Sequence, residues 1–280
     1  MKRTLMIIQT STSLALASLV LLTACKKDAR QQQTTSVTRP AASSLHLSSV
    51  GDTLLNVNYE SGTLNSGIPG VTATGAPAPD AAYMISPGAT GNYGIAHKVI
   101  FGDSSYVSAG HYRSESDADS VYVARFLPGN IRRYEFSVLL SNWPIWDSSQ
   151  PVSQPVIFQT KITGPAYVPC QIMAKRNAFV ARFADASYTT LVSDFSPYIN
   201  QWVKFRIDVS WSTTTSGYMN IYTELPGDTS YTLRLTKTNV VTYTGNGTTD
   251  HGYIKWGVYD GPTSGTRIDY HDDIHVIALN

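Results

Sequence analysis

The sequence predicts an all-β protein, a sandwich or jelly roll of two antiparallel sheets. Helical periodicity is almost absent, whereas short runs of alternating apolar and polar residues recur along the chain. Gly, Pro, Asn and Asp separate these runs, as turns do in sheet proteins. Charged residues make up 15% and aromatic residues 11% of the 280 residues, a mix typical of an extracytoplasmic β-protein with a polar aromatic surface.

Residues 1–24 have the order of a bacterial lipoprotein signal peptide. Lys2 and Arg3 form a short positive region, and an apolar run from Leu14 to Leu22 follows. That run is too short and too rich in Ser and Thr for a spanning helix. Leu22-Thr23-Ala24-Cys25 resembles the lipobox, whose cysteine is lipidated and becomes the first mature residue. We expect Cys25 to anchor the protein to a membrane of the bacterial cell envelope, at the outer membrane or cell surface. The alternative is an ordinary signal peptide with a coincidental cysteine.

Residues 25–49 are rich in Lys, Gln, Thr, Ser and Pro and predict a flexible tether before a single domain at 50–280. Cys170 is the only other cysteine, so lipidation of Cys25 leaves no disulfide within the chain. Removing residues 1–24 takes away two cations and changes the formal net charge from +1 to −1. The low charge content does not suit a nucleic-acid binder, which needs clustered Lys and Arg. The near-neutral balance means that an anionic partner would be held by a local cluster rather than by a global field. We expect a monomer.

Alternating runs place the expected strands along the domain. Val203 to Trp211 is the clearest run, and 218–223 pairs with it as a hairpin. The loop at 142–153 carries Trp143 and Trp146, either as a stacking platform for sugar rings or as a packed edge. The other expected strands begin after an opening segment at 56–62 and cover 97–101, 107–117, 134–140, 155–162, 253–259 and 269–278.

The stretch from Tyr253 to Tyr259 carries an unusual polar row. Read as a strand, it directs Ile254, Trp256 and Val258 toward a core, and Tyr253, Lys255 and Tyr259 toward an open face. Gly257 is expected to leave a gap in that open face. Two phenols and an ammonium provide groups for acid–base chemistry.

Two further strands add polar rows of the same kind. His111, Arg113 and Glu115 share one face of their strand, and Gln159 and Lys161 share one face of theirs. A guanidinium fork suits a carboxylate, and an amide can donate to one. These residues are therefore the candidate partners of the row at 253–259.

The order of these segments resembles the β-jelly-roll polysaccharide lyases, the group of alginate lyase, glucuronan lyase and heparin lyase I. Three motifs carry the resemblance: Arg113-Ser114-Glu115-Ser116-Asp117, Gln159-Thr160-Lys161 and Tyr253-Ile254-Lys255-Trp256-Gly257-Val258-Tyr259. It covers the domain from about residue 55 and implies a concanavalin A-like β-jelly roll. Three positions depart from the family pattern: Asp117 stands in place of a second Arg, Lys161 in place of a His, and the core-facing Trp256 in place of a small residue.

The resemblance implies a lyase that cleaves an anionic, uronic-acid-containing polysaccharide by β-elimination. Arg113 and Gln159 would neutralise the substrate carboxylate, and Tyr259 would act as the acid and, for some substrates, also as the base. Lys161 would serve as a base or hold the carboxylate. Neither a cofactor nor a catalytic metal is expected. The residues expected to bind substrate around this set are Tyr253, Lys255, Glu115 and His111.

Other interpretations of these residues stay open. Arg113 and Glu115 can form a surface ion pair, Gln159 and Lys161 can be solvated, and Tyr259 can bind sugar without catalysis. The chain would then be a non-catalytic carbohydrate-binding module. A glycoside hydrolase is a third alternative, because Glu115, Asp117 and Asp119 share a strand face.

The histidines offer few alternatives. His271-Asp272-Asp273 indicates a structural hydrogen-bonding feature or a structural calcium site rather than a catalytic one. His111 or His251 can stand in for the missing His of the second motif. His46, His97, His111, His251 and His275 show no ligand spacing, so no other metal site is expected.

Overall fold

The computed structural model describes residues 48–164, 167–245, 247–261 and 264–280. The predicted signal peptide, Cys25 and nearly all of the predicted tether lie outside the described residues. Helix is confined, in the described ranges, to short 3₁₀ turns at Ser104–Tyr106, Tyr122–Ala124 and Ser196–Tyr198. No helix within these ranges is long and apolar enough to cross a membrane.

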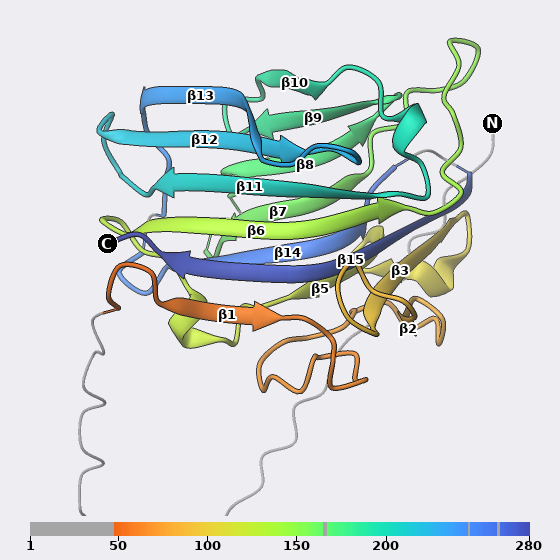
Figure 1. The fold of residues 1–280 in the computed structure, drawn as a ribbon, viewed down its shortest axis with the longest axis horizontal. Coiled ribbons are helices and arrows are strands. Elements are labelled where there is room, and N and C mark those ends of the chain that lie inside the picture. The colour runs from red at the N-terminus through yellow and green to blue at the C-terminus, as the bar shows by residue number, and fades with distance from the viewer. Residues whose placement is uncertain (1–47, 165–166, 246, 262–263) are drawn as a thin grey trace, which may run out of the picture. The chain divides into compact units, whose positions relative to one another are not determined.

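The described chain from residue 48 forms two antiparallel sheets packed face to face, which confirms the predicted fold class (Figure 1). One sheet has eight strands, in the order β13 (Thr232–Val240), β12 (Gly217–Glu224), β11 (Trp202–Ser210), β6 (Ile131–Leu140), β15 (Gly265–Ala278), β3 (Gly94–Phe101) and β2 (Ala82–Ile85), with β1 (Thr53–Val57) paired to β15. The other has seven, in the order β10 (Tyr188–Val192), β9 (Ala178–Phe183), β8 (Cys170–Lys175), β7 (Val156–Ile162), β14 (Gly252–Tyr259), β5 (His111–Asp117) and β4 (Val107–Ser108).

The predicted strands are present, with ends shifted by a few residues. The hairpin of β11 and β12 forms as expected, with Ile207 opposite Ile221. Strands β2, β8, β9, β10 and β13 were not predicted from the sequence. Strand β8 reads Cys-Gln-Ile-Met-Ala-Lys, and five of its six residues are buried. Because both faces of this strand are covered, it lacks the polar–apolar alternation by which the other strands were recognised.

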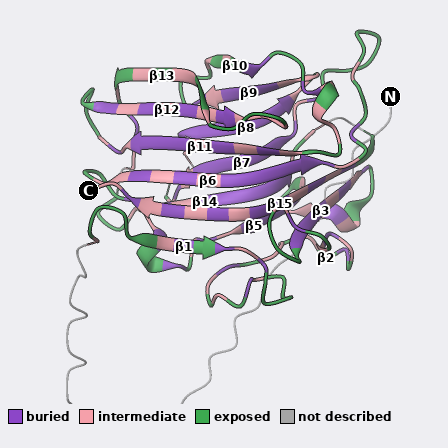
Figure 2. Cartoon of the chain, viewed as in Figure 1, coloured by how far each residue is buried: buried purple, intermediate pink, exposed green. Residues whose placement is uncertain are grey.

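Aromatic side chains join the two sheets at the centre of the sandwich. Phe136 on β6 stacks on Phe158 of β7, with ring centroids 4.2 Å apart, and on Phe205 of β11 at 5.1 Å. Trp256 on β14 donates its indole N–H to the hydroxyl of Tyr59 at 2.9 Å. Burying such large rings is the main favourable contribution to stability. Figure 2 shows the buried residues concentrated in the central strands of both sheets, between exposed loops.

The two tryptophans of the loop at 142–153 differ in their surroundings, and each fits one of the two predicted roles, packed edge or stacking platform. Trp143 is buried beneath the guanidinium of Arg267, 5.5 Å from its ring, and is a packed edge. Trp146 lies partly exposed, with the Arg176 guanidinium 5.0 Å from its ring. Only Trp146 therefore stays available as a stacking platform.

Candidate active site

A row of polar side chains crosses the outer face of the seven-stranded sheet. Residues directly opposite each other in adjacent strands share a face, so the strand register alone defines the row. Trp256, which follows Lys255, points into the core, and Lys255 therefore points outward. From β5 to β10 the row consists of Asp117, Lys255, Gln159, Gln171, Arg182 and Tyr188.

Glu115 organises the floor of this face. Its carboxylate accepts a hydrogen bond from the Gln159 amide at 2.6 Å and one from the Lys255 ammonium at 2.8 Å. The Arg113 guanidinium lies 3.9 Å away from the same carboxylate. Glu115, Gln159 and Lys255 are all buried, so Glu115 and Lys255 form an internal ion pair. The pair of Arg113 and Glu115, for which one interpretation allowed a surface position, has side chains that are 19% and 2% exposed. Glu115 was predicted to bind substrate, but both of its oxygens are already engaged by other side chains.

Tyr259 and Arg113 lie directly opposite each other on β14 and β5. The exposed His111 ring is adjacent, with its centroid 5.3 Å from that of Tyr259. Burial raises the pKa of Tyr259, and the negative charges of Asp260 and Glu115 raise it further, while Arg113 opposes them. The phenol therefore stays protonated at neutral pH and can donate a proton. A guanidinium, an imidazole and a phenol thus meet at one end of β14.

Lys161 lies at the other end of the strand, opposite Tyr253. Tyr253 precedes Tyr259 by six residues, which is about 20 Å along an extended strand. The two predicted catalytic residues Lys161 and Tyr259 thus share a sheet face but lie far apart on it. Desolvation lowers the pKa of Lys161, and the Lys255 charge lowers it further, against the opposing effect of Glu115. Burial likewise raises the pKa of the Tyr253 phenol.

Gly257 sits at an irregularity of β14, where the register with β7 shifts between Trp256 and Tyr259. We expected this glycine to leave a gap on the open face. Its φ of +119° instead directs the missing side chain inward, where a Cβ atom would collide with the carbonyl of Ser114 and lie 2.8 Å from the His97 ring. Glycine is required here because the backbone needs positive φ and approaches its neighbours closely.

Three residues that the sequence did not single out, Gln171, Arg182 and Tyr188, extend the polar row. The Arg182 guanidinium donates to the Gln171 side chain at 3.0 Å, and both side chains line a polar hollow of about 410 Å³ together with Tyr259 and Tyr188. The Lys175 ammonium lies 3.7 Å from the centre of the Tyr188 ring. These residues come from β8, β9 and β10, three strands that were not predicted, so no motif could single them out.

The remaining predicted polar groups have structural partners. Asp119 pairs with His251 at 2.7 Å. Asp119 is the third carboxylate of the glycoside hydrolase alternative, and this carboxylate is therefore already engaged by a side chain. The Asp272 carboxylate accepts backbone N–H groups from Ala89, Thr90 and Asp273 at 2.8, 3.2 and 2.8 Å, and so stabilises a loop. This matches the structural hydrogen-bonding interpretation of the closing strand.

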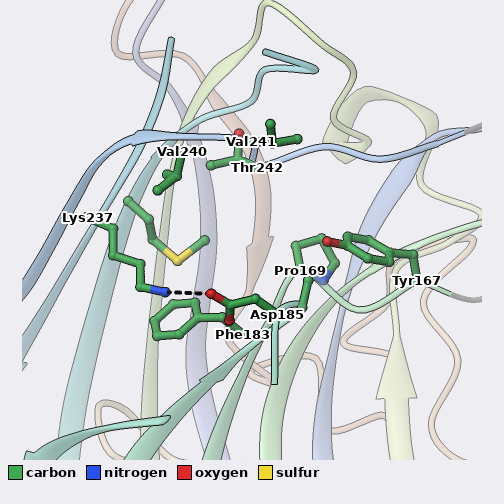
Figure 3. Close-up of a pocket in the computed structure, with 10 residues that line it drawn as sticks. Tyr167, Pro169, Phe183, Asp185, Lys237, Val240, Val241 and Thr242 are labelled. Carbon is green, nitrogen blue, oxygen red and sulfur yellow. Dashed lines mark ion pairs between the residues drawn. The ribbon is translucent and has the colours of Figure 1, made fainter. Parts of the chain in front are cut away.

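A second hollow, of about 340 Å³, lies where β9 faces the end of β13 (Figure 3). The Lys237 ammonium reaches Asp185 at 3.7 Å and lies 3.7 Å from the centre of the Phe183 ring. Most other lining groups are apolar, and the predicted site residues are absent from the described lining. The polar face around Tyr259 is therefore the better candidate for catalysis.

Solved structures with the same fold include two lyases and one hydrolase. The endo-β-1,4-glucuronan lyase of the fungus Trichoderma reesei is 17% identical over 70% of this chain and 87% of its own, with a TM-score of 0.51. An alginate lyase from Aplysia kurodai is 10% identical over 81% and 99%, with a TM-score of 0.52. A family 131 glycoside hydrolase from Coprinopsis cinerea is 11% identical over 81% and 94%, with a TM-score of 0.54.

At these identities the three structures establish the fold alone. No curated protein sequence matches the chain. The sequence model of one family, described as "Polysaccharide lyase", matches residues 60–275, which is most of the chain and contains every residue of the polar face. This chain therefore belongs to the polysaccharide lyase family.

Proposed function

We propose that the protein is a lyase that cleaves a uronic-acid-containing polysaccharide by β-elimination, with Tyr259 at its reactive centre. The observation that carries the proposal is the meeting of Tyr259, Arg113 and His111 at one end of β14. The hollow beside Tyr259 also contains Arg182, a second cation for an anionic polymer. The names of two structures with this fold specify glucuronan and alginate, both polymers of uronic acids.

The chemistry assigns each group a step. Arg113 pairs with the uronate carboxylate and stabilises the charge that develops when the adjacent C5 loses its proton. His111 takes that proton, because imidazole is the usual base near neutral pH. The electron pair then forms the C4=C5 double bond while the bond from C4 to the glycosidic oxygen breaks. Tyr259 donates its phenolic proton to the departing oxygen, so the reaction consumes no water.

A panel of polymers tests this function. The protein is incubated with alginate, glucuronan and a heparin-like polymer, and the ultraviolet absorbance of the unsaturated product is followed. At least one polymer is expected to give a steady rise. New reducing ends without this absorbance would indicate hydrolysis. Binding without any cleavage would instead support a non-catalytic carbohydrate-binding module.

Lys161 and Tyr253 form a second contact region for the polymer at the far end of β14. We propose that the Lys161 ammonium holds a carboxylate of a neighbouring sugar rather than acting on C5, because it lies opposite Tyr253 and not Tyr259. Its charge then contributes to binding, and Tyr253 supplies an aromatic face for the ring.

The lowered pKa of Lys161 predicts a pH-dependent KM. Desolvation and the nearby Lys255 charge make Lys161 lose its proton at a lower pH than an ordinary lysine. KM is therefore expected to rise as pH increases through that lowered pKa, and Lys161→Arg, which keeps its charge, is expected to remove this rise. If kcat instead rises with pH in the wild type and is lost in Lys161→Arg, Lys161 is the base.

We also propose that Cys25 carries a lipid anchor that holds the protein in the bacterial cell envelope, at the outer membrane or cell surface. The order of positive region, apolar run and Leu-Thr-Ala-Cys supports this. Cells fed a labelled fatty acid are expected to label the wild-type chain and not Cys25→Ser. Equal labelling of both chains would contradict the anchor.

A further inference from the structure

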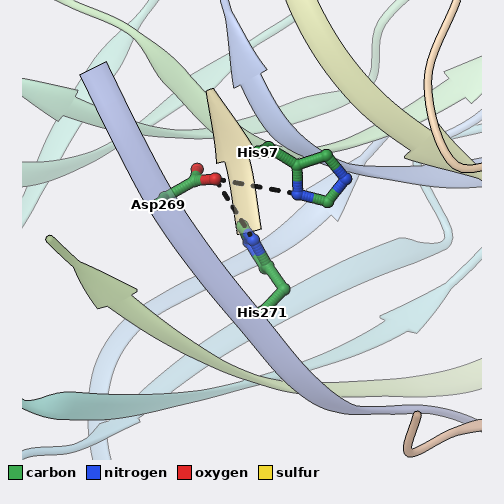
Figure 4. A group of neighbouring side chains, drawn as sticks. All are labelled: His97, Asp269 and His271. Carbon is green, nitrogen blue, oxygen red and sulfur yellow. Dashed lines mark ion pairs between the residues drawn. The ribbon is translucent and has the colours of Figure 1, made fainter. Parts of the chain in front are cut away.

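Three ionisable side chains meet inside the sandwich, behind the strand that carries Tyr259. His97 on β3 lies directly opposite Asp269 on β15, and His271 is two residues further along β15. One Asp269 oxygen is 3.8 Å from His97 Nδ1 and 3.5 Å from His271 Nδ1 (Figure 4). All three side chains are fully buried. The sequence showed no ligand spacing for His97, because this contact depends on strand pairing across more than half of the chain.

These groups lack the hydrogen bonds that burial demands. Both oxygens of Asp269, both ring nitrogens of His271 and Nδ1 of His97 have no hydrogen-bond partner among the described residues. A buried polar group without a partner costs about 1–3 kcal/mol, and more when it is charged. Five such atoms at one point therefore indicate that something other than a protein side chain satisfies them.

Ser116 determines which nitrogen of His97 is free. The Ser116 hydroxyl donates to the carbonyl of Ala73 at 2.9 Å, so its oxygen accepts a hydrogen bond from His97 Nε2, also at 2.9 Å. The proton of this imidazole is then on Nε2, and Nδ1 directs a lone pair at the Asp269 carboxylate. Such an arrangement is repulsive unless a metal ion or a proton lies between the two. Fixing the tautomer through the distal nitrogen is the usual outer support of a metal-bound histidine.

The donor set defines the class of cation. One ligand atom from each of the three residues lies within 4.8 Å of those of the other two. Bonds of about 2.1 Å to a tetrahedral ion separate neighbouring ligand atoms by about 3.4 Å, close to the distances at Asp269. Two imidazoles and one carboxylate suit Zn²⁺, Co²⁺, Ni²⁺ or Fe²⁺, whereas Ca²⁺ and Mg²⁺ prefer oxygen ligands throughout.

We propose that His97, Asp269 and His271 bind one divalent transition-metal ion of the zinc class. The ion would tie β3 to β15 in the eight-stranded sheet. Through His97 it would also support the seven-stranded sheet, because His97 bonds Ser116 on β5 and packs where a side chain on Gly257 would lie. The site is enclosed, so the ion enters during folding and supports the floor beneath Tyr259 without taking part in the reaction.

Refolding of the full chain tests the proposal. The protein is unfolded in guanidinium with a chelator and refolded in parallel with Co²⁺, Zn²⁺, Ca²⁺ or chelator alone, and loosely bound metal is then removed. We expect about one Co²⁺ or Zn²⁺ to stay bound per chain by elemental analysis, with Co²⁺ giving visible absorption bands. Either ion is expected to raise Tm by about 5–10 °C, and Ca²⁺ to have no effect.

Matched variants locate the ion. His97→Gln and His271→Asn are expected to lose the bound Co²⁺, while His275→Asn, at a partly exposed histidine of the same strand, keeps it. Ser116→Ala keeps all three ligands and is expected to weaken Co²⁺ binding by roughly 10- to 100-fold. Wild-type protein that retains no transition metal overturns the proposal, whether or not the ligand variants fold. Retention of Co²⁺ by His97→Gln, or stabilisation by Ca²⁺ alone, overturns it as well.

Discussion

Replacing Tyr259 with Phe is expected to lower kcat by about 10²- to 10⁴-fold, the usual contribution of one general acid or base. The change removes only the hydroxyl, and the half-buried ring keeps its place on β14 beside His111. Because the raised pKa of Tyr259 keeps the phenol protonated at neutral pH, the lost group is the proton donor that the leaving oxygen needs. Initial rates of ultraviolet absorbance increase measure the loss, and circular dichroism verifies the fold.

Tyr253→Phe is the matched control for this change. Tyr253 points to the same sheet face from the same strand, but it lies opposite Lys161 and away from Arg113. Its hydroxyl is expected to affect KM more than kcat. If Tyr259→Phe keeps the wild-type kcat, or if both variants lose kcat equally, Tyr259 is not the proton donor and the reactive centre lies elsewhere on the face.

The sequence predicted strands well where one face of the strand is buried and the other is exposed to solvent. Strand β11 shows this pattern, with Lys204 and Arg206 outward and Phe205 and Ile207 in the core. Strands β8 and β9 lack it, because their outer side forms part of the candidate site floor and is itself covered. The weakest part of the strand prediction therefore coincides with part of the candidate site.

The candidate site was predicted in part: its residues on β5, β7 and β14 were named, but those on β8, β9 and β10 and the arrangement of the whole set were not. Strand alternation and the resemblance selected residues that do lie on one sheet face, including Arg113, Gln159, Lys161 and Tyr259. The spacing of residues within one strand does not determine the register between strands. It is this register that places Lys161 opposite Tyr253 and far from Tyr259. The inward turn at Gly257 depends on a bulge, and alternation alone cannot place one.

Replacing Glu115 with Ala is expected to destabilise the protein by about 3–5 kcal/mol, the usual cost of removing one partner of a buried ion pair. Glu115 is 4% exposed and Lys255 7%, so the variant leaves a buried ammonium without its counter-charge. The Gln159 amide also loses its acceptor. Denaturant unfolding measures the free energy. Glu224→Ala is the control, since its pair with Lys204 is much more exposed, with side chains 20% and 43% exposed, and worth about 0–1 kcal/mol.

A double variant separates the charge pair from the hydrogen-bond network. In Glu115→Gln/Lys255→Met, the new amide oxygen can still accept from Gln159, and the buried ammonium is gone. Arg113 loses its counter-charge, but its side chain is 19% exposed and reaches solvent. Most of the lost stability is expected to return, because uncharged replacements for a buried ion pair are often neutral or stabilising. Activity is expected to stay low if the Glu115 charge holds Arg113 and Gln159 in place for the substrate carboxylate. Recovery of both stability and activity would show that the buried pair serves stability alone, and that Arg113, His111 and Tyr259 act without it.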